Sequence, residues 1–298
     1  MKSRFALLAF AAALGCLTIP SFPSLDAQTR RPQSLTSLVG PLSLTRDTNG
    51  DGLADAVAAR VIVPATPAMA DVEVATNLAA RIGYETTALT LPLVLRDREV
   101  AQPASIVVPI LVGRSNQFIQ RLIDSKAIDV STLHPGQGLI AAVASPLGGG
   151  DGLVVIGGDD EGTLNAGIEL AARLPRVWGM NGIALPGVEE QAVRYLRGNG
   201  INAGSAAIAS MIVDSDKRGI ARVSLHLAVP EAEVQRTTKL LDDLERAHRR
   251  GLEPKTLNFT NVASTAIDVL SGTRVAAHVA PIHTEPASGL DHRRGLHR

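Results

Sequence analysis

Residues 152–175 read GLVVIGGDDEGTLNAGIELAARLP, and this stretch decides the fold. The apolar run Leu153–Ile156 predicts a buried strand, and the glycine-rich acidic turn after it leads into a helix expected over Thr163–Leu174, with Thr163 as its cap. The three acids at 159–161 stand where negative charge stabilises a helix start. A nucleotide-binding loop is disfavoured, because the glycine spacing is wrong and these carboxylates would repel a phosphate. We therefore interpret the acids as structural.

The segments before this stretch also alternate between strand and helix patterns. Strands are expected at Val57–Val63, Tyr84–Leu95, Ser105–Arg114 and Leu139–Ala144, and helices at Met69–Ile82 and Asn116–Ala127, the latter capped by Ser115. Alternation of this kind predicts an α/β fold, with a mixed sheet covered by helices. We place this α/β domain at residues 41–197.

A smaller unit is predicted after a glycine-rich linker that ends at Gly204. Strands are expected at Ile208–Val213, Ile220–Val229 and Thr256–Leu270, with a helix at Glu231–Arg250. The order strand–helix–strand indicates a ferredoxin-like half, and we place this unit at 205–271. Residues 272–298 are predicted to be a disordered tail, because their composition is rich in Pro, Gly, His and Arg.

The N-terminus has the pattern of an export signal. A basic start is followed by an apolar run, Phe5–Leu17, and Ala27 offers a small residue at a cleavage point. The predicted boundaries are a signal peptide at 1–27 and a flexible leader at 28–40. Lipidation at Cys16 is the disfavoured alternative, because Ala13 stands where a large aliphatic residue is usual. We expect an exported protein, periplasmic or extracellular, and no later apolar run is long enough to cross a membrane.

Residues 47–55, DTNGDGLAD, have the spacing of a calcium loop. The predicted ligands are the side chains of Asp47, Asn49, Asp51 and Asp55 and the backbone carbonyl of Leu53, with Gly52 making the sharp turn. Calcium prefers oxygen donors, and a cation would relieve the repulsion among three nearby carboxylates. The pattern departs from an EF-hand at the twelfth position, where Ala58 replaces the bidentate Glu. The alternative is an Asp/Asn/Gly turn that binds no metal.

Two resemblances extend this interpretation. The loop is similar to the short calcium loops of dockerins, thrombospondin type 3 repeats and FG-GAP repeats. The order of elements over residues 56–178, with "IGGDDEGT" after a strand, resembles the small α/β accessory domain that precedes the barrel in family 20 hexosaminidases and α-glucuronidases. Similar modules occur in the periplasmic regulatory subunit of cellulose synthase. Catalysis in those enzymes belongs to the barrel, so the resemblance implies a fold and a polysaccharide context and transfers no catalytic residue.

Composition narrows the function further. The formal net charge is +0 and aromatic residues are 3% of the chain, which argues against a nucleic-acid partner. The sequence has no G-x-S-x-G elbow and no H-E-x-x-H pair, so no residue is assigned a catalytic role. We expect a non-catalytic exported binding or scaffold module of the cell envelope, whose partner is a polysaccharide or another envelope protein. The alternatives are a hydrolase of unrecognised type, a purely structural assembly protein, or a fragment of a larger exported enzyme.

Overall fold

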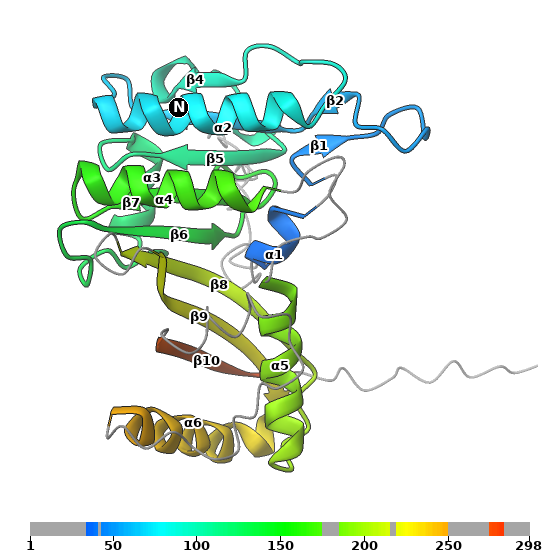
Figure 1. Ribbon diagram of the computed structural model, residues 1–298, viewed down its shortest axis with the longest axis vertical. Helices are drawn as coiled ribbons and strands as arrows, with labels where there is room; N and C mark the ends of the chain where they lie inside the picture. Colours follow the sequence, from blue (N-terminus) through cyan, green and yellow to red (C-terminus); the bar gives the residue numbers. More distant parts are fainter. Residues whose placement is uncertain (1–33, 41–42, 175–184, 215–218, 250–273, 283–298) are drawn as a thin grey trace, which may run out of the picture. The chain divides into compact units, whose positions relative to one another are not determined.

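The computed structural model describes residues 34–40, 43–174, 185–214, 219–249 and 274–282. Within these residues eight strands form one mixed sheet in the order β10-β9-β8-β6-β7-β5-β3-β4 (Figure 1). Their bounds are β3 Ala59–Val63, β4 Val94–Arg96, β5 Val108–Val112, β6 Gln137–Val143, β7 Gly152–Gly157, β8 Ser205–Asp214, β9 Gly219–Pro230 and β10 Arg274–Ile282. A separate two-stranded sheet joins β1 Thr45–Arg46 to β2 Ala56–Val57.

The directions of the strands confirm the predicted α/β fold. Strands β4, β3, β5 and β7 are parallel to one another, while β6 runs antiparallel to both β7 and β8. Every residue of β7 is buried, in agreement with the apolar run that predicts it. This apolar strand lies in the interior of the mixed sheet, between β6 and β5.

Alternate residues of the central strands β3, β5, β7 and β6 face two different hydrophobic clusters. On β7, Leu153 and Val155 belong to the cluster that includes buried residues of α1 Leu35–Leu38, α2 Met69–Tyr84, α4 Asp160–Arg173 and α5 Leu185–Gly198. Val154 and Ile156 belong to the other cluster, to which α3 Gln117–Asp124 contributes. Helices thus cover both faces of the sheet, and α2 and α4 lie side by side on one of them (Figure 1).

Two helix caps differ from the sequence-based prediction. Helix α4 begins at Asp160, and its cap is Asp159, whose carboxylate accepts the Gly162 N–H at 2.8 Å. Thr163 was expected to be this cap, but it lies inside the first turn and is buried. The structural interpretation of the acids at 159–161 is confirmed for Asp159. An aspartate in extended backbone reaches the free N–H groups that a later threonine cannot reach.

The cap of α3 is also displaced by one residue. Asn116, not Ser115, accepts the Phe118 N–H at 3.0 Å. Asn116 is fully buried, and its amide donates to the Ile62 carbonyl of the neighbouring strand at 2.9 Å. Asparagine suits this position because one side chain caps α3 and also joins it to β3, which the exposed Ser115 does not do.

The predicted strand at Tyr84–Leu95 is largely wrong. Only Val94–Arg96 forms a strand, at the edge next to β3, and most of the segment before it is loop. The threonines that favour a strand are used differently, because the Thr87 N–H and the hydroxyls of Thr86 and Thr87 all donate to the Ala54 carbonyl at 2.8–3.0 Å. A tertiary contact has overridden the local β preference.

The strands of the second predicted unit continue the same sheet. β8 pairs with β6, and β9 is followed by a short 3-10 helix, η4 Glu231–Glu233, and by α6 Val234–Arg249. β10 lies parallel to β9, inside the residues expected to be a tail. The strand expected at Thr256–Leu270 lies outside the described residues. The expected linker is also well packed, with Ile201 and Ala203 buried at 1% and 0% exposure.

The described part of the N-terminal region is short. The predicted signal peptide, its cleavage point and Cys16 lie outside the described residues. In the expected leader, residues 34–40 include α1, whose Leu35 and Leu38 are buried in the core. No helix in the described ranges is both long and apolar enough to cross a membrane.

Candidate functional site

The predicted calcium loop lies between β1 and β2. The carboxylate of Asp47 accepts the Gly50 N–H at 2.6 Å and the Gly52 N–H at 2.8 Å. Both glycines have positive φ, +78° and +88°, which allows the chain to curl around this carboxylate. The hydrogen bond from Gly52 is the largest cause that lowers the pKa of Asp47, so this carboxylate is held in its charged form.

The other predicted ligands lie in the same turn. Asn49 Oδ1 accepts the Asp51 N–H at 3.0 Å, and Asp51 Oδ1 accepts the Leu53 N–H at 2.8 Å. Asp55 accepts both the N–H and the hydroxyl of Thr48, at 2.9 and 2.7 Å. All five predicted residues lie in one loop, and the side-chain oxygens of the four polar ones accept hydrogen bonds from the loop itself.

The donor set suits calcium in kind, but it is smaller than an EF-hand set. Its members are three carboxylates, one amide oxygen and one backbone carbonyl, all hard oxygen donors. Ala58, at the twelfth position, is buried, and its N–H donates to the Leu44 carbonyl at 2.9 Å, so it belongs to the base of the hairpin. Among the described residues, no three His, Cys, Asp or Glu side chains converge closely enough to hold a metal ion. A bound cation would therefore have to draw these oxygens together and take its remaining ligands from water.

The base of the loop is anchored to the core. Ala54 is buried, and its carbonyl accepts the three hydrogen bonds from Thr86 and Thr87. The Asp55 N–H donates to the Arg46 carbonyl at 2.8 Å, which closes the hairpin. The hydrogen bonds to Ala54 thus connect the loop to the segment that leads into β4.

A second candidate region is the edge at which β3, β5 and β7 end. Ligands of open α/β sheets commonly bind at the carboxyl ends of the strands, where helices depart to opposite faces. Here an aspartate side chain of the chain itself lies at the N-terminus of each departing helix. Asp71 accepts the Ala68 N–H at α2, Asp97 accepts the Gln117 N–H at α3, and Asp159 caps α4, at 2.8–2.9 Å. These carboxylates fill the positions that a phosphate would need, which supports the interpretation against nucleotide binding.

Asp71 is the residue at this edge that sequence reasoning missed. Its carboxylate is 4% exposed and packs against Gly113, whose φ is +85° and whose Cβ, if present, would collide with it. Burial is the main cause that raises the pKa of Asp71, and the charge of Asp160 adds to the shift. An aspartate at the third position of a predicted helix is a capping signal, but its burial depends on a glycine of another strand. We interpret Asp71 as a structural cap.

Two comparisons with known proteins assign no family to this chain. A scan against protein-family models gives no match. A search of curated proteins also gives no match.

Proposed function

We propose that this chain is a non-catalytic binding or scaffold module, exported to the cell envelope or the extracellular space and stabilised by calcium at residues 47–55. The observation that carries the proposal is the loop in which Asp47 holds the amides of Gly50 and Gly52. This arrangement fixes the sharp turn that a D-x-N-x-D-G calcium loop requires. The resemblance to an accessory α/β domain supports a polysaccharide, or an envelope protein that handles one, as its partner.

The charges of the loop favour a cation over a bare turn. Asp47, Asp51 and Asp55 lie within one loop that projects from the core, and Asp51 is exposed. A bound cation would offset the repulsion among these carboxylates and restrain the tip. Weak loops of this kind can be filled outside the cell, since extracellular calcium modules bind with dissociation constants of about 10⁻⁴–10⁻³ M.

Thermal unfolding of the full chain in excess calcium and in excess chelator tests this proposal. A ligand that binds only the folded state at a hundredfold excess over Kd adds about 2.7 kcal/mol to the free energy of unfolding. For a chain of this size, that corresponds to a rise in Tm of roughly 5–10 °C. We expect Asp51→Ala to remove the rise.

Asp129→Ala is the matched control. Asp129 is also an exposed aspartate in a turn, where it accepts the Ser131 N–H at 2.9 Å, but it lies far from the loop in sequence. This variant should keep the calcium-dependent rise in Tm. Identical melts of the unmodified chain in calcium and in chelator would contradict the proposal and leave residues 47–55 as a turn that binds no metal.

A further inference from the structure

A groove separates the solvent-facing sides of α2 and α4. It has a volume of about 650 Å³ and is lined by Asn77, Ala80, Arg81, Tyr84, Ile168 and Ala171. The two helices are in close contact at Gly167, where an added Cβ would collide with Val74. Towards their C-terminal ends, the small side chains of Ala80 and Ala171 leave the groove open. The groove is largely open to solvent, so a ligand would lie along it with one side exposed.

Each helix contributes one exposed apolar side chain to the groove. Tyr84, on α2, is 70% exposed, and Ile168, on α4, is 50% exposed. Aromatic residues are only 3% of this chain, and burial of an aromatic ring stabilises a fold, so an exposed ring is notable here. These two side chains give the groove an apolar surface on each of its sides.

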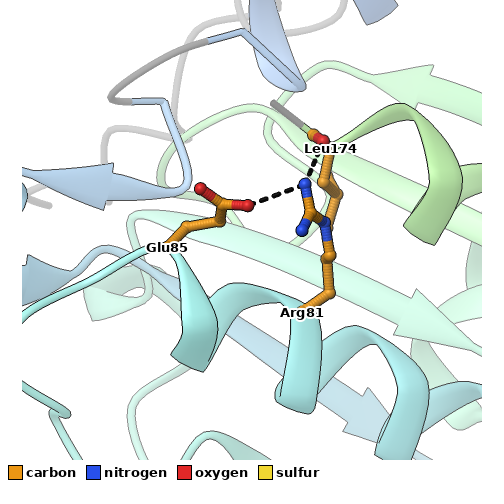
Figure 2. A network of polar contacts seen from close by, with 3 residues as sticks. All are labelled: Arg81, Glu85 and Leu174. Atoms are coloured by element: carbon orange, nitrogen blue, oxygen red, sulfur yellow. Dashed lines mark hydrogen bonds and ion pairs between the residues drawn. The ribbon is translucent and has the colours of Figure 1, made fainter. Parts of the chain in front are cut away.

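The charged side chain of the groove, that of Arg81, is held in place. Arg81 Nη2 contacts Glu85 Oε1 at 2.7 Å and donates to the Leu174 carbonyl at 2.9 Å, so the guanidinium bridges α2 to the end of α4 (Figure 2). Glu85 is buried at 7% exposure, and its charge compensates that of Arg81. Asn77 lies one turn before Arg81 and adds an exposed amide.

We infer that the α2/α4 groove binds a neutral oligosaccharide. A sugar ring has apolar C–H faces that can pack on Tyr84 and Ile168, and hydroxyl groups that can bond to the Asn77 amide and the Arg81 guanidinium. An anionic ligand is disfavoured, because Glu85 already compensates Arg81. An acyl chain would remove the polar groups from water without replacing their hydrogen bonds. The inference rests on the proposed binding function and is independent of the calcium loop.

The test is an NMR titration of the isotope-labelled full chain with three probes: cellohexaose, chitohexaose and the anionic hexagalacturonate. Each titration is run in calcium and in chelator, so that a failure of the calcium proposal remains distinguishable from a failure of this one. At least one neutral probe should shift the amide signals of Asn77–Tyr84 and of Ile168–Ala171. Tyr84→Ala should weaken that binding about tenfold or more, whereas Tyr84→Phe keeps the ring and should stay within about threefold.

Met69→Ala is the matched control, since Met69 is a 74% exposed apolar residue on the same helix but outside the groove. It should bind as the unmodified chain does. The inference would be overturned if neither neutral probe binds, if Tyr84→Ala leaves binding unchanged, or if only the anionic probe binds. Amide shifts confined to other elements would overturn it as well.

Discussion

Gly113→Ala tests whether the buried carboxylate of Asp71 and the turn after β5 are packed as described. Gly113 has a φ of +85°, and a Cβ at this position would collide with the Asp71 carboxylate. The left-handed backbone costs about 1–2 kcal/mol for a residue with a Cβ. Overpacking against a buried group costs about 1–3 kcal/mol more. We therefore expect a loss of roughly 2–5 kcal/mol in the free energy of unfolding.

Gly148→Ala separates these two costs. Gly148 has nearly the same φ, +82°, but no atom lies within 4 Å of its added Cβ. It should lose about 1–2 kcal/mol, which is the backbone cost alone. Urea unfolding of the full chain, followed by circular dichroism, gives both values.

A double-mutant cycle completes the test. If the collision is with Asp71, adding Asp71→Ala to Gly113→Ala should cost less than the sum of the two single changes. Equal losses for Gly113→Ala and Gly148→Ala, together with additivity in the cycle, would refute the packing described here.

Three further predictions concern the acids and the N-terminus. The pKa of Asp71 is raised in the folded chain, so folding takes up a proton at pH values between the ordinary pKa and the raised one. The free energy of unfolding should therefore fall as the pH rises through this window. Urea melts at several pH values should show this slope, and Asp71→Asn should remove it. Asp159→Ala should cost about 0.5–2 kcal/mol of unfolding free energy by urea melt, because the cap of α4 is lost, and a cost near zero would contradict the capping role. If residues 1–27 are a signal peptide, N-terminal sequencing of the secreted chain should begin at Gln28, and an intact Met1 on secreted protein would contradict this.

The parts of the fold that sequence reasoning predicts well are those fixed by local pattern. The run Leu153–Ile156 is uninterrupted and apolar, so β7 is recognisable without knowledge of its neighbours. Helix α2 is predicted from Met69 because its apolar residues recur at helical spacing. Helical spacing does not by itself define the buried face, since Val72 is 44% exposed whereas Val74, two residues later, is fully buried.

The parts that sequence reasoning misses depend on contacts between distant segments. Thr86 and Thr87 favour a strand locally, but the Ala54 carbonyl, more than thirty residues earlier, holds them in a loop. Asp71 is buried only because β5 brings Gly113 against it. Arg81, which lines the α2/α4 groove, contacts Leu174, 93 residues away. No local periodicity or sequence motif indicates these contacts between distant residues.

The loop at residues 47–55, predicted to bind calcium, combines local and long-range features. Spacing alone places Asp47, Asn49, Asp51, Leu53 and Asp55 in one turn, and the structure has them there. The bonds from Thr48 to Asp55 and the anchoring of Ala54 follow from the hairpin and from a distant loop. The affinity of the loop for a cation depends on how easily these internal bonds give way.

Calorimetric titration of the metal-free full chain with calcium is the most direct test of the proposed function. We expect one calcium ion per chain, bound with a Kd of about 10⁻⁴–10⁻³ M, and loss of that binding in Asp51→Ala but not in Asp129→Ala. No binding at millimolar calcium, or binding that Asp51→Ala leaves unchanged, would contradict the proposal that residues 47–55 hold the ion.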